Sequence, residues 1–397
     1  MLNSLIKKNS LVVIGLNAGT SADGLDLAAI RIVFSKRSPK VSFIGGETVP
    51  YPKLLSLGVN SGISNRIRSV DEVIQLDRLL GIFYGEQAKK FSASLRRQGI
   101  IADLLASHGQ TIRHLTGKVL GRNKKESGSL QLGHPESIAE QTGLITVADF
   151  RQADIACGGE GAPITSYAMW QLFSHTKEDR LIVNIGGIAN YFFFPAGCSP
   201  QKAKARDCGP GNSLIDIITE KYFHRSFDCY GRLAARGRIS QRLLILLMAD
   251  DYLKGKCGPS TGRERFGDKF ADKIIKYGKQ LKLNGLDLLA TATELTAITI
   301  ANSIQGFINK HALEKSYFLG GGFKNRYLLG RLKAYLPKTS LISIDRLGYN
   351  PDYLEAVCYA VMGAMAIKSR PTGLAHITGA KKQSVAGRII QPPTDKN

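Results

Sequence analysis

The feature that most constrains the fold of this chain is a strand–turn–strand pattern that occurs twice. The first copy covers residues 11–34, with a glycine-containing turn at 17–24, and the second covers residues 181–194, with a turn at 185–190. Two runs of β-forming residues on either side of a short glycine turn are typical of a β-hairpin. We therefore expect two domains that each begin with a hairpin, as after an ancient structural duplication.

The order of the remaining elements favours an α/β protein. Apolar periodicity predicts a helix at about 70–97, and short apolar runs predict strands at 104–107 and 144–148. Strands that alternate with helices in this way are typical of α/β folds with mixed sheets.

Length indicates two domains. A chain of 397 residues exceeds the size at which one hydrophobic core stops growing. The charged segment at 175–180 is the expected hinge, which gives domains at 1–178 and 179–397. The last predicted helix, at 353–367, follows in the second domain but is also compatible with packing on the first domain. The residues from about Gln383 are expected to be weakly ordered.

Composition describes an ordinary globular protein with an unusual charge. Apolar residues make up 43% of the chain, yet the net charge is +22. Such a charge favours anionic ligands. Lys and Arg are spread along the whole chain and do not interleave with aromatic residues, so we expect a generally basic surface and no nucleic-acid partner.

Cysteine spacing and hydropathy indicate the compartment. No two of the six cysteines have zinc-ligand or redox spacing, which favours free thiols in a reducing cytoplasm. No apolar run is long enough to span a membrane, and the first one is too short for a signal peptide. We expect a cytoplasmic protein without a membrane partner; the oligomeric state stays open, a homodimer included.

Asp207 is the residue that most constrains the chemistry. It opens the stretch Asp-Cys-Gly-Pro-Gly-Asn, a sharp turn before a predicted helix with Asn212 or Ser213 as its N-cap. An acid at a strand-to-helix turn is expected to face a cleft, where it can act as a general base.

Three glycine turns are candidates for binding phosphate. Gly19–Asp26 offers backbone amides and hydroxyls to an anion, and its aspartates would then need a bridging Mg²⁺ or a water; a plain hairpin turn explains the same residues. Gly186-Gly187 with Asn190, and Gly320-Gly321-Gly322 before a helix from about Asn325, are also compatible with ordinary turns. Neither the Walker nor the Rossmann glycine pattern occurs.

Other polar residues follow strands or interrupt apolar helices. His108 and His114 flank Gln110 without an evident third metal ligand, so hydrogen-bonding or structural histidines are favoured. Arg151 and Asp154 suit substrate binding or a surface ion pair. Glu355, on an otherwise apolar helix, belongs either to a solvated face or to a second catalytic carboxylate.

Together and in this order, these stretches closely resemble the anhydro-N-acetylmuramic acid kinase family. The resemblance covers nearly the whole chain and is carried by the turns above and by the segments 107–114, 149–154, 158–163, 184–187, 207–212, 260–264, 320–325 and 355–356. It implies a two-domain actin/hexokinase/Hsp70-like (ribonuclease H-like) α/β fold with mixed sheets and an interdomain cleft.

The resemblance also implies a reaction. ATP and water convert 1,6-anhydro-N-acetylmuramic acid, an amino sugar of peptidoglycan recycling, into N-acetylmuramic acid 6-phosphate. Asp207 would be the general base and Glu355 a secondary catalytic contact. The remaining implied contacts are Gly19, Thr20, Ser21, Ala22, Asp23, Gly24, Leu25, Asp26, Gly186, Gly187, Gly320, Gly321, Gly322 and Asn325 for ATP, His108, Gln110, Arg151, Asp154 and Asn190 for the sugar, and Asp23, directly or through water, for Mg²⁺.

The chain departs from the family pattern at a few positions. Asn17-Ala18 stand where Met-Ser is usual, Glu160 stands for Gln, His134 for Asn or Asp, and Tyr230 for Asp. The alternatives to this enzyme are a kinase of the same fold for another amino sugar, a nucleotide-gated binding protein without turnover and, more remotely, a basic nucleic-acid binder.

Overall fold

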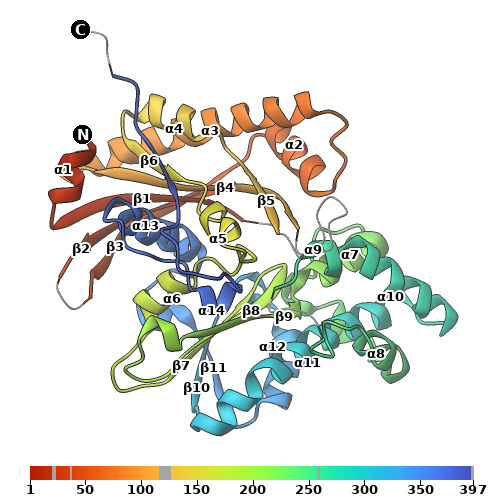
Figure 1. Cartoon of the computed structure of the whole chain (residues 1–397). Coiled ribbons are helices and arrows are strands. Elements are labelled where there is room, and N and C mark those ends of the chain that lie inside the picture. Colours follow the sequence, from red (N-terminus) through yellow and green to blue (C-terminus); the bar gives the residue numbers. More distant parts are fainter. Residues whose placement is uncertain (20–23, 36–37, 116–126, 257–259, 395–397) are drawn as a thin grey trace. The chain divides into compact units, whose positions relative to one another are not determined.

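The computed structural model describes residues 1–19, 24–35, 38–115, 127–256 and 260–394. The chain divides into two compact units (Figure 1). Unit 1 comprises Met1–Leu172 and Asp352–Asn397, and unit 2 comprises Phe173–Pro351. The first division therefore lies six residues before the expected boundary after residue 178. The C-terminal residues from Asp352 are part of the first unit and not of a domain that runs from 179 to 397.

The sheet of unit 1 begins with the expected hairpin. Strand β2 is antiparallel to both of its neighbours, β1 and β3. On the other side of β1 the sheet continues with β4 and then β6, which are parallel to β1. Two antiparallel additions, β12 on β6 and β5 on β4, complete it. The bounds are β1 Ser10–Ala18, β2 Gly24–Val33, β3 Lys40–Pro50, β4 Leu104–Leu115, β5 Gly128–Leu132, β6 Ile145–Ala148 and β12 Arg388–Ile390.

The sheet of unit 2 repeats this design. Its first three strands are antiparallel, and β10 and β11 follow in parallel beside β7. The order β3-β2-β1-β4-β6 in one unit thus corresponds to β9-β8-β7-β10-β11 in the other. The bounds are β7 Arg180–Ile185, β8 Ile188–Phe194, β9 Lys204–Pro210, β10 Lys315–Leu319 and β11 Ser340–Ser343. The predicted α/β fold with mixed sheets is confirmed, and the same strand order recurs in both units.

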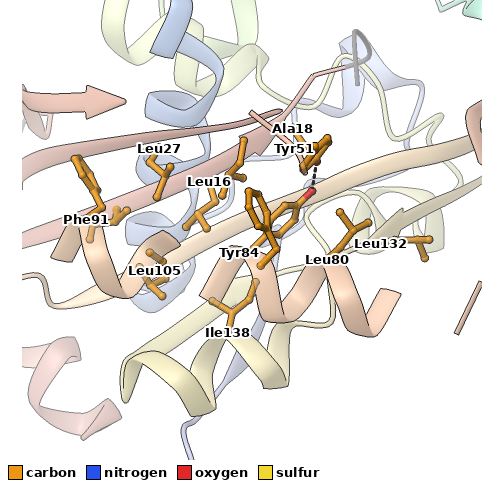
Figure 2. Packing of buried hydrophobic residues seen from close by; sticks show 14 of the residues in the cluster. Leu16, Ala18, Leu27, Tyr51, Leu80, Tyr84, Phe91, Leu105, Leu132 and Ile138 are labelled. Atoms are coloured by element: carbon orange, nitrogen blue, oxygen red, sulfur yellow. Dashed lines mark hydrogen bonds between the residues drawn. The ribbon is translucent and has the colours of Figure 1, made fainter. Parts of the chain in front are cut away.

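One long helix covers one face of the unit 1 sheet. Helix α3 (Val70–Arg97) has the predicted bounds and is capped by the Ser69 side chain. The apolar face of α3 packs on the strand side chains that point toward it, among them Leu16, Leu27 and Leu105. Figure 2 shows Tyr84 and Phe91 of the helix among these residues. The other helices of the unit are α1 Leu2–Lys7, α2 Lys53–Ile63, α4 Pro135–Thr142, α5 Gln152–Ala156, α6 Ser166–Phe173 (which ends at the boundary), α13 Leu354–Ile367 and α14 Ala375–Thr378.

The opposite face of this sheet carries α13. A Cβ atom on Gly15 of β1 would overlap with the carbonyl oxygen of Ala356, and one on Gly363 would come within 2.6 Å of the Ala106 side chain. Only glycine permits this close approach, which places the first turn of α13 directly on β1. This face is the one that carries polar side chains.

In unit 2 the long helix α11 (Gly285–His311) packs on the sheet with α12 (Arg326–Tyr335). Together they bury an apolar cluster that includes Val183, Ile185 and Phe318. A second apolar cluster lies mainly among helices and includes Leu288 and Leu295 of α11. The other helices are α7 Asn212–Phe223, α8 Gln241–Met248, α9 Arg263–Phe266 and α10 Asp268–Gln280.

Two expectations about local structure were wrong. The strand predicted at 104–107 continues to Leu115, because pairing with β5 satisfies the backbone of the polar segment 108–115. The residues from Gln383 include a strand, β12, which pairs with β6. The final residues 395–397 lie outside the described part.

Candidate functional site

A row of polar side chains crosses the first three strands of unit 1. Asn17 pairs with Asp26, and Asp26 pairs with Thr48. Their neighbours along the strands belong to the apolar cluster under α3, so these three side chains point to the α13 face. The Thr48 hydroxyl donates to Asp26 Oδ1 at 2.6 Å. Asp26 is therefore partly exposed on the face of the sheet that carries α13.

Glu355 joins this row from the first turn of α13. Asn17 Nδ2 donates to Glu355 Oε2 at 2.9 Å, and Asn17 itself is buried. Glu355 keeps exposed surface, yet the protein packed around it raises the pKa of its carboxyl group, because burial penalises the charged form. The hydrogen bond from Asn17 and the positive charge of Arg151 oppose this rise. The structure thus joins the exposed Glu355 to Asn17, and its role as a second catalytic carboxylate stays a prediction.

Arg151 and His108 are brought together beside the same helix. Arg151 Nε donates to His108 Nε2 at 3.1 Å, and the imidazole stacks on Tyr359 of α13 at a centroid distance of 4.3 Å. Burial, and secondarily the charge of Arg151, lower the pKa of His108 well below its ordinary value. Because Nε2 accepts from Arg151, the neutral ring carries its proton on Nδ1, which is buried.

Two of the predicted sugar contacts are used inside the protein. Asp154 is fully buried; its Oδ2 accepts from Gly161 N at 2.9 Å and its Oδ1 from the Thr378 hydroxyl at 2.6 Å. Gln110 is also fully buried, and its amide contacts Tyr51 and Gly19. In this structure both side chains are bonded inside the protein, where Asp154 holds the glycine turn, and their contact with the sugar stays a prediction.

The predicted phosphate loop is described only at its ends. Thr20, Ser21, Ala22 and Asp23 lie outside the described residues, and with them the predicted Mg²⁺ contact. Gly19 follows β1, while Gly24, Leu25 and Asp26 lie in β2. A Cβ atom on Gly24 would approach the Val49 carbonyl to 2.5 Å, so this position requires glycine.

Unit 2 has a polar row at the equivalent place. Asn184 pairs with Asn190, and Asn190 pairs with Asp207. Their strand neighbours Val183 and Cys208 face the α11 cluster, so the row lies on the opposite face. The pairing is irregular between Ala189 and Asn190, a β-bulge that redirects the side chains beside it.

Asp207 lies at this bulge and is more enclosed than the sequence predicted. It is in strand β9, three residues before the strand ends, and only 7% of it is exposed. Its Oδ2 accepts from Thr261 N at 2.8 Å and from the Ser260 hydroxyl at 3.2 Å. Tyr252 donates to its backbone carbonyl at 2.7 Å. The carboxylate is held in one orientation, beside the buried Oδ1 of Asn190, for which the described residues supply no partner.

The helix after Asp207 is not capped as predicted. Gly211 is the N-cap of α7 and makes no side-chain cap. The Ser213 hydroxyl donates to the Phe266 carbonyl, and Asn212 Nδ2 to the Ile185 carbonyl at 3.3 Å. The first amides of α7 instead bind the turn between β7 and β8, because the carbonyls of Gly186 and Gly187 accept them at 2.8 to 3.1 Å.

The glycines after β10 pack against this same turn. Gly320 has a φ of +85°, and a Cβ on Gly322 would overlap with Ile185. Gly321 is exposed, and its Cβ position is 3.5 Å from Asn212 Nδ2. Asn325 is buried and caps α12, since its Oδ1 accepts from Leu328 N at 3.0 Å. A direct ATP contact through this oxygen is therefore corrected to a capping role.

No cluster of three or more His, Cys, Asp or Glu side chains that could hold a metal ion occurs in the described ranges. In the same ranges no helix is long and apolar enough to cross a membrane.

Comparison with known proteins decides the family. The sequence profile of the anhydro-N-acetylmuramic acid kinase family matches residues 11–392. The chain belongs to the anhydro-N-acetylmuramic acid kinase family. The kinase of this name from Caldanaerobacter subterraneus subsp. tengcongensis is 35% identical over 97% of this chain and 98% of its own length. That from Rippkaea orientalis is 36% identical over 96% and 99%.

Solved structures are more distant. A ROK hexokinase from Thermus thermophilus covers 89% of this chain and 99% of its own length, at 15% identity and a TM-score of 0.34. Component A of the (R)-2-hydroxyglutaryl-CoA dehydratase of Acidaminococcus fermentans covers 89% and 99%, at 12% identity and a TM-score of 0.41.

Several residues that contact the predicted site residues were not predicted from the sequence. Tyr252 contacts Asp207 and Tyr359 supports His108, but a tyrosine in an apolar context carries no local signal. Ser260 and Thr261 lie in the segment 260–264, and both donate to the Asp207 carboxylate. Asn17, a polar residue in an apolar strand and a departure from the family pattern, was the one available signal.

Proposed function

We propose that this chain uses ATP and water to convert 1,6-anhydro-N-acetylmuramic acid into N-acetylmuramic acid 6-phosphate, with release of ADP, in peptidoglycan recycling. The water oxygen bonds to the anomeric carbon as the bond from that carbon to O6 breaks. O6 takes the γ-phosphoryl group of ATP. The proton lost by the water passes to Asp207 and from there to solvent.

One observation carries the proposal: the family profile spans residues 11–392, and within it Asp207 is fixed at a β-bulge by specific donors. Bulges recur beside active sites, where they redirect a side chain. The two donors to Oδ2 hold the carboxylate in one orientation. A positioned carboxylate that takes a proton from water contributes a rate factor of about a hundred to ten thousand.

The α13 face of unit 1 supports a role in binding the sugar. Two donors lie there: the Asn17 amide, which donates to Glu355, and the Arg151 guanidinium, which donates to His108. An amino sugar offers hydroxyl, acetamido and carboxylate oxygens that can accept from such donors. We assign Arg151 to the anionic lactyl group, because a guanidinium binds carboxylates well.

ATP and Mg²⁺ are assigned to the glycine turns. Gly19–Asp26, Gly186-Gly187 and Gly320–Gly322 remain the proposed phosphate and nucleoside contacts, with Asp23 as the predicted metal contact. The partly exposed Asp26 carboxylate is a hard oxygen donor of the kind that suits Mg²⁺, directly or through water. When bound, Mg²⁺ would neutralise charge on the phosphates during transfer.

Isotope labelling tests this proposal. The purified protein is incubated with ATP, Mg²⁺ and the anhydro sugar in ¹⁸O-labelled water, and the products are analysed by mass spectrometry. We expect a phosphorylated, ring-opened sugar with the label on the anomeric oxygen. ATP hydrolysis without a sugar product would point to another acceptor, and no turnover would favour a nucleotide-gated binding protein.

A further inference from the structure

We propose that Gln110, Tyr51 and Tyr84 form a hydrogen-bonded chain that positions Gly19, the first residue of the phosphate loop. The role of that loop rests on the proposed function; the chain of contacts is a separate observation. All three residues belong to unit 1, and none of them is a contact to substrate in this assignment. They act through the backbone of Gly19 and are therefore positioning residues.

The hydrogen bonds run in one direction from the core to the loop. Gln110 Nε2 donates to the Gly19 carbonyl at 3.1 Å, and the Tyr51 hydroxyl donates to Gln110 Oε1 at 3.1 Å. The two tyrosine hydroxyls are 2.6 Å apart, a contact drawn in Figure 2. Because the single hydroxyl proton of Tyr51 is given to Gln110, Tyr84 must donate to Tyr51. This direction fixes the Gln110 amide with its nitrogen toward Gly19.

Burial makes this arrangement rigid. Gln110 and Tyr84 are fully buried and Tyr51 is 7% exposed. A polar group without a partner is costly in such surroundings, so each member depends on its neighbour to stay bonded. The Tyr51 ring also packs edge-on against Phe83 at a centroid distance of 5.6 Å, which restricts its movement. Burial, with the neighbouring Tyr51, raises the pKa of Tyr84 well above its ordinary value, so that it remains a donor.

The two ends of the phosphate loop are held by different means. Gly24 is part of the β2–β3 ladder, where it pairs with Pro50. On the other side β1 ends at Ala18, whose register partner in β4 is Gln110, after an irregularity in the β1–β4 pairing. Gly19 is beyond the strand, and the Gln110 side chain holds it there.

The same chain joins both ends of the loop. Tyr51 directly follows Pro50, the partner of Gly24, and its hydroxyl leads through Gln110 to Gly19. The β1–β2 ladder ends at the pair Asn17 and Asp26, and beyond it the side-chain hydrogen bonds connect the two ends of the loop. Loss of the Gln110 amide should release Gly19 while β1 and β2 stay paired.

Three substitutions of the full-length protein test this inference, with calorimetric binding of ADP as the first readout. Gln110→Met should weaken ADP binding about tenfold, and Tyr51→Phe about threefold, the size expected for single hydrogen bonds. Tyr84→Phe is the matched control. It also removes one buried tyrosine hydroxyl, but this hydroxyl is one hydrogen bond farther from Gly19, so its loss should have the smallest effect. The KM for ATP should follow these changes, and the KM for the sugar should not.

Gln110→Glu gives a second readout that a merely structural role would not change. It keeps the length of the side chain and an acceptor for Tyr51. The neutral acid can still donate to the Gly19 carbonyl, but the carboxylate cannot. ADP affinity should therefore fall as the pH rises in this variant and stay level in the wild type over the same range. This variant also serves if Gln110→Met does not fold.

Three results would overturn the inference. One is a raised sugar KM with unchanged ADP affinity in Gln110→Met, which would make Gln110 a substrate contact. Another is an equal loss in all three variants that follows their melting temperatures. The third is a pH-independent affinity of Gln110→Glu. A wild type that binds ADP but does not phosphorylate the sugar would refute the proposed function and leave this test valid.

Discussion

The polar rows of the two units occupy the same place in the same strand order but differ in where the carboxylate stands. In unit 1 the row is Asn17, Asp26 and Thr48, with the acid on the middle strand. In unit 2 the row is Asn184, Asn190 and Asp207, with the acid on the third strand and at a β-bulge. The two sheets thus have equivalent faces, and the position of one carboxylate distinguishes them.

The partners of these carboxylates differ as well. Asp26 accepts from Thr48 on the next strand, a contact that the sheet itself supplies. Asp207 accepts from Ser260 and Thr261, which are more than fifty residues away along the chain. A carboxylate held by a separate loop can be oriented independently of the sheet, as a general base requires. We therefore assign proton transfer to the unit 2 row and phosphate and metal contact to the unit 1 row.

The largest expected effect comes from removing the base. Asp207→Asn keeps the shape and one acceptor for Thr261 N, but an amide cannot take the proton of water. We expect kcat to fall about a hundred- to ten-thousand-fold, with ADP affinity unchanged by calorimetry. Turnover close to that of the wild type would remove Asp207 from the mechanism and end the functional distinction between the rows.

The second expected effect concerns the strand that extends unit 1 beyond its counterpart. β4 continues through His114, whereas β10 ends at Leu319. Burial, and secondarily the charge of Arg151, lower the pKa of His114 to about 4. The unfolded chain takes up a proton near pH 6.5 and the folded chain does not, so stability should fall as the pH drops from 6.5 toward 4, by at most about 3 kcal/mol.

Urea unfolding at pH 7 and at pH 4.5 measures this loss. His114→Asn removes the titrating ring and should reduce the difference between the two pH values, with the exposed His376→Asn as the control. If the free energy of unfolding fell by the same amount between pH 7 and pH 4.5 in the wild type and in His114→Asn, His114 would not be the cause of the acid destabilisation.

The third prediction concerns the same Asp-to-Asn change in the polar row of unit 1. Asp26→Asn should raise the Mg²⁺ concentration needed for half-maximal activity about tenfold, as for one lost charge-assisted contact. At saturating Mg²⁺ its kcat should stay within a few-fold of the wild type. A kcat loss as large as that of Asp207→Asn would mean that the rows share one role.

The smallest effect concerns Asn17. Because its amide stabilises the charged form of Glu355, Asn17→Met, the residue usual in the family, should raise the pKa of Glu355 further. The acid limb of the kcat–pH profile should then move to higher pH, with less than about a tenfold loss at the optimum. Thr48→Val is the matched control in the same row, and an unchanged limb in Asn17→Met would separate Glu355 from catalysis.

Elements with a strong local pattern could be predicted from the sequence. The helix at 70–97 was correct to the residue, because an apolar face with helical period and a capping serine define it. The repeated hairpins gave the duplicated sheets. The continuation of β4 could not be foreseen, since it depends on pairing with β5, which no local pattern reports.

For the site, the sequence supplied residue types but not the directions of side chains. Asp154 looked like a substrate contact, yet its oxygens bind Gly161 and Thr378, the latter 224 residues away. Gln110 likewise turns toward the core. Contacts of this range arise only from the tertiary fold, so Asp207 could be named from its turn while its partners Ser260 and Thr261 could not be assigned.

A structure of Asp207→Asn with ADP, Mg²⁺ and the unreacted anhydro sugar tests the central claim most directly. We expect an ordered water within hydrogen-bonding distance of the residue 207 side chain and beside the anomeric carbon, on the side opposite O6. The claim would be contradicted if the sugar bound in order and residue 207 contacted only Ser260 and Thr261, with no water between it and the anomeric carbon.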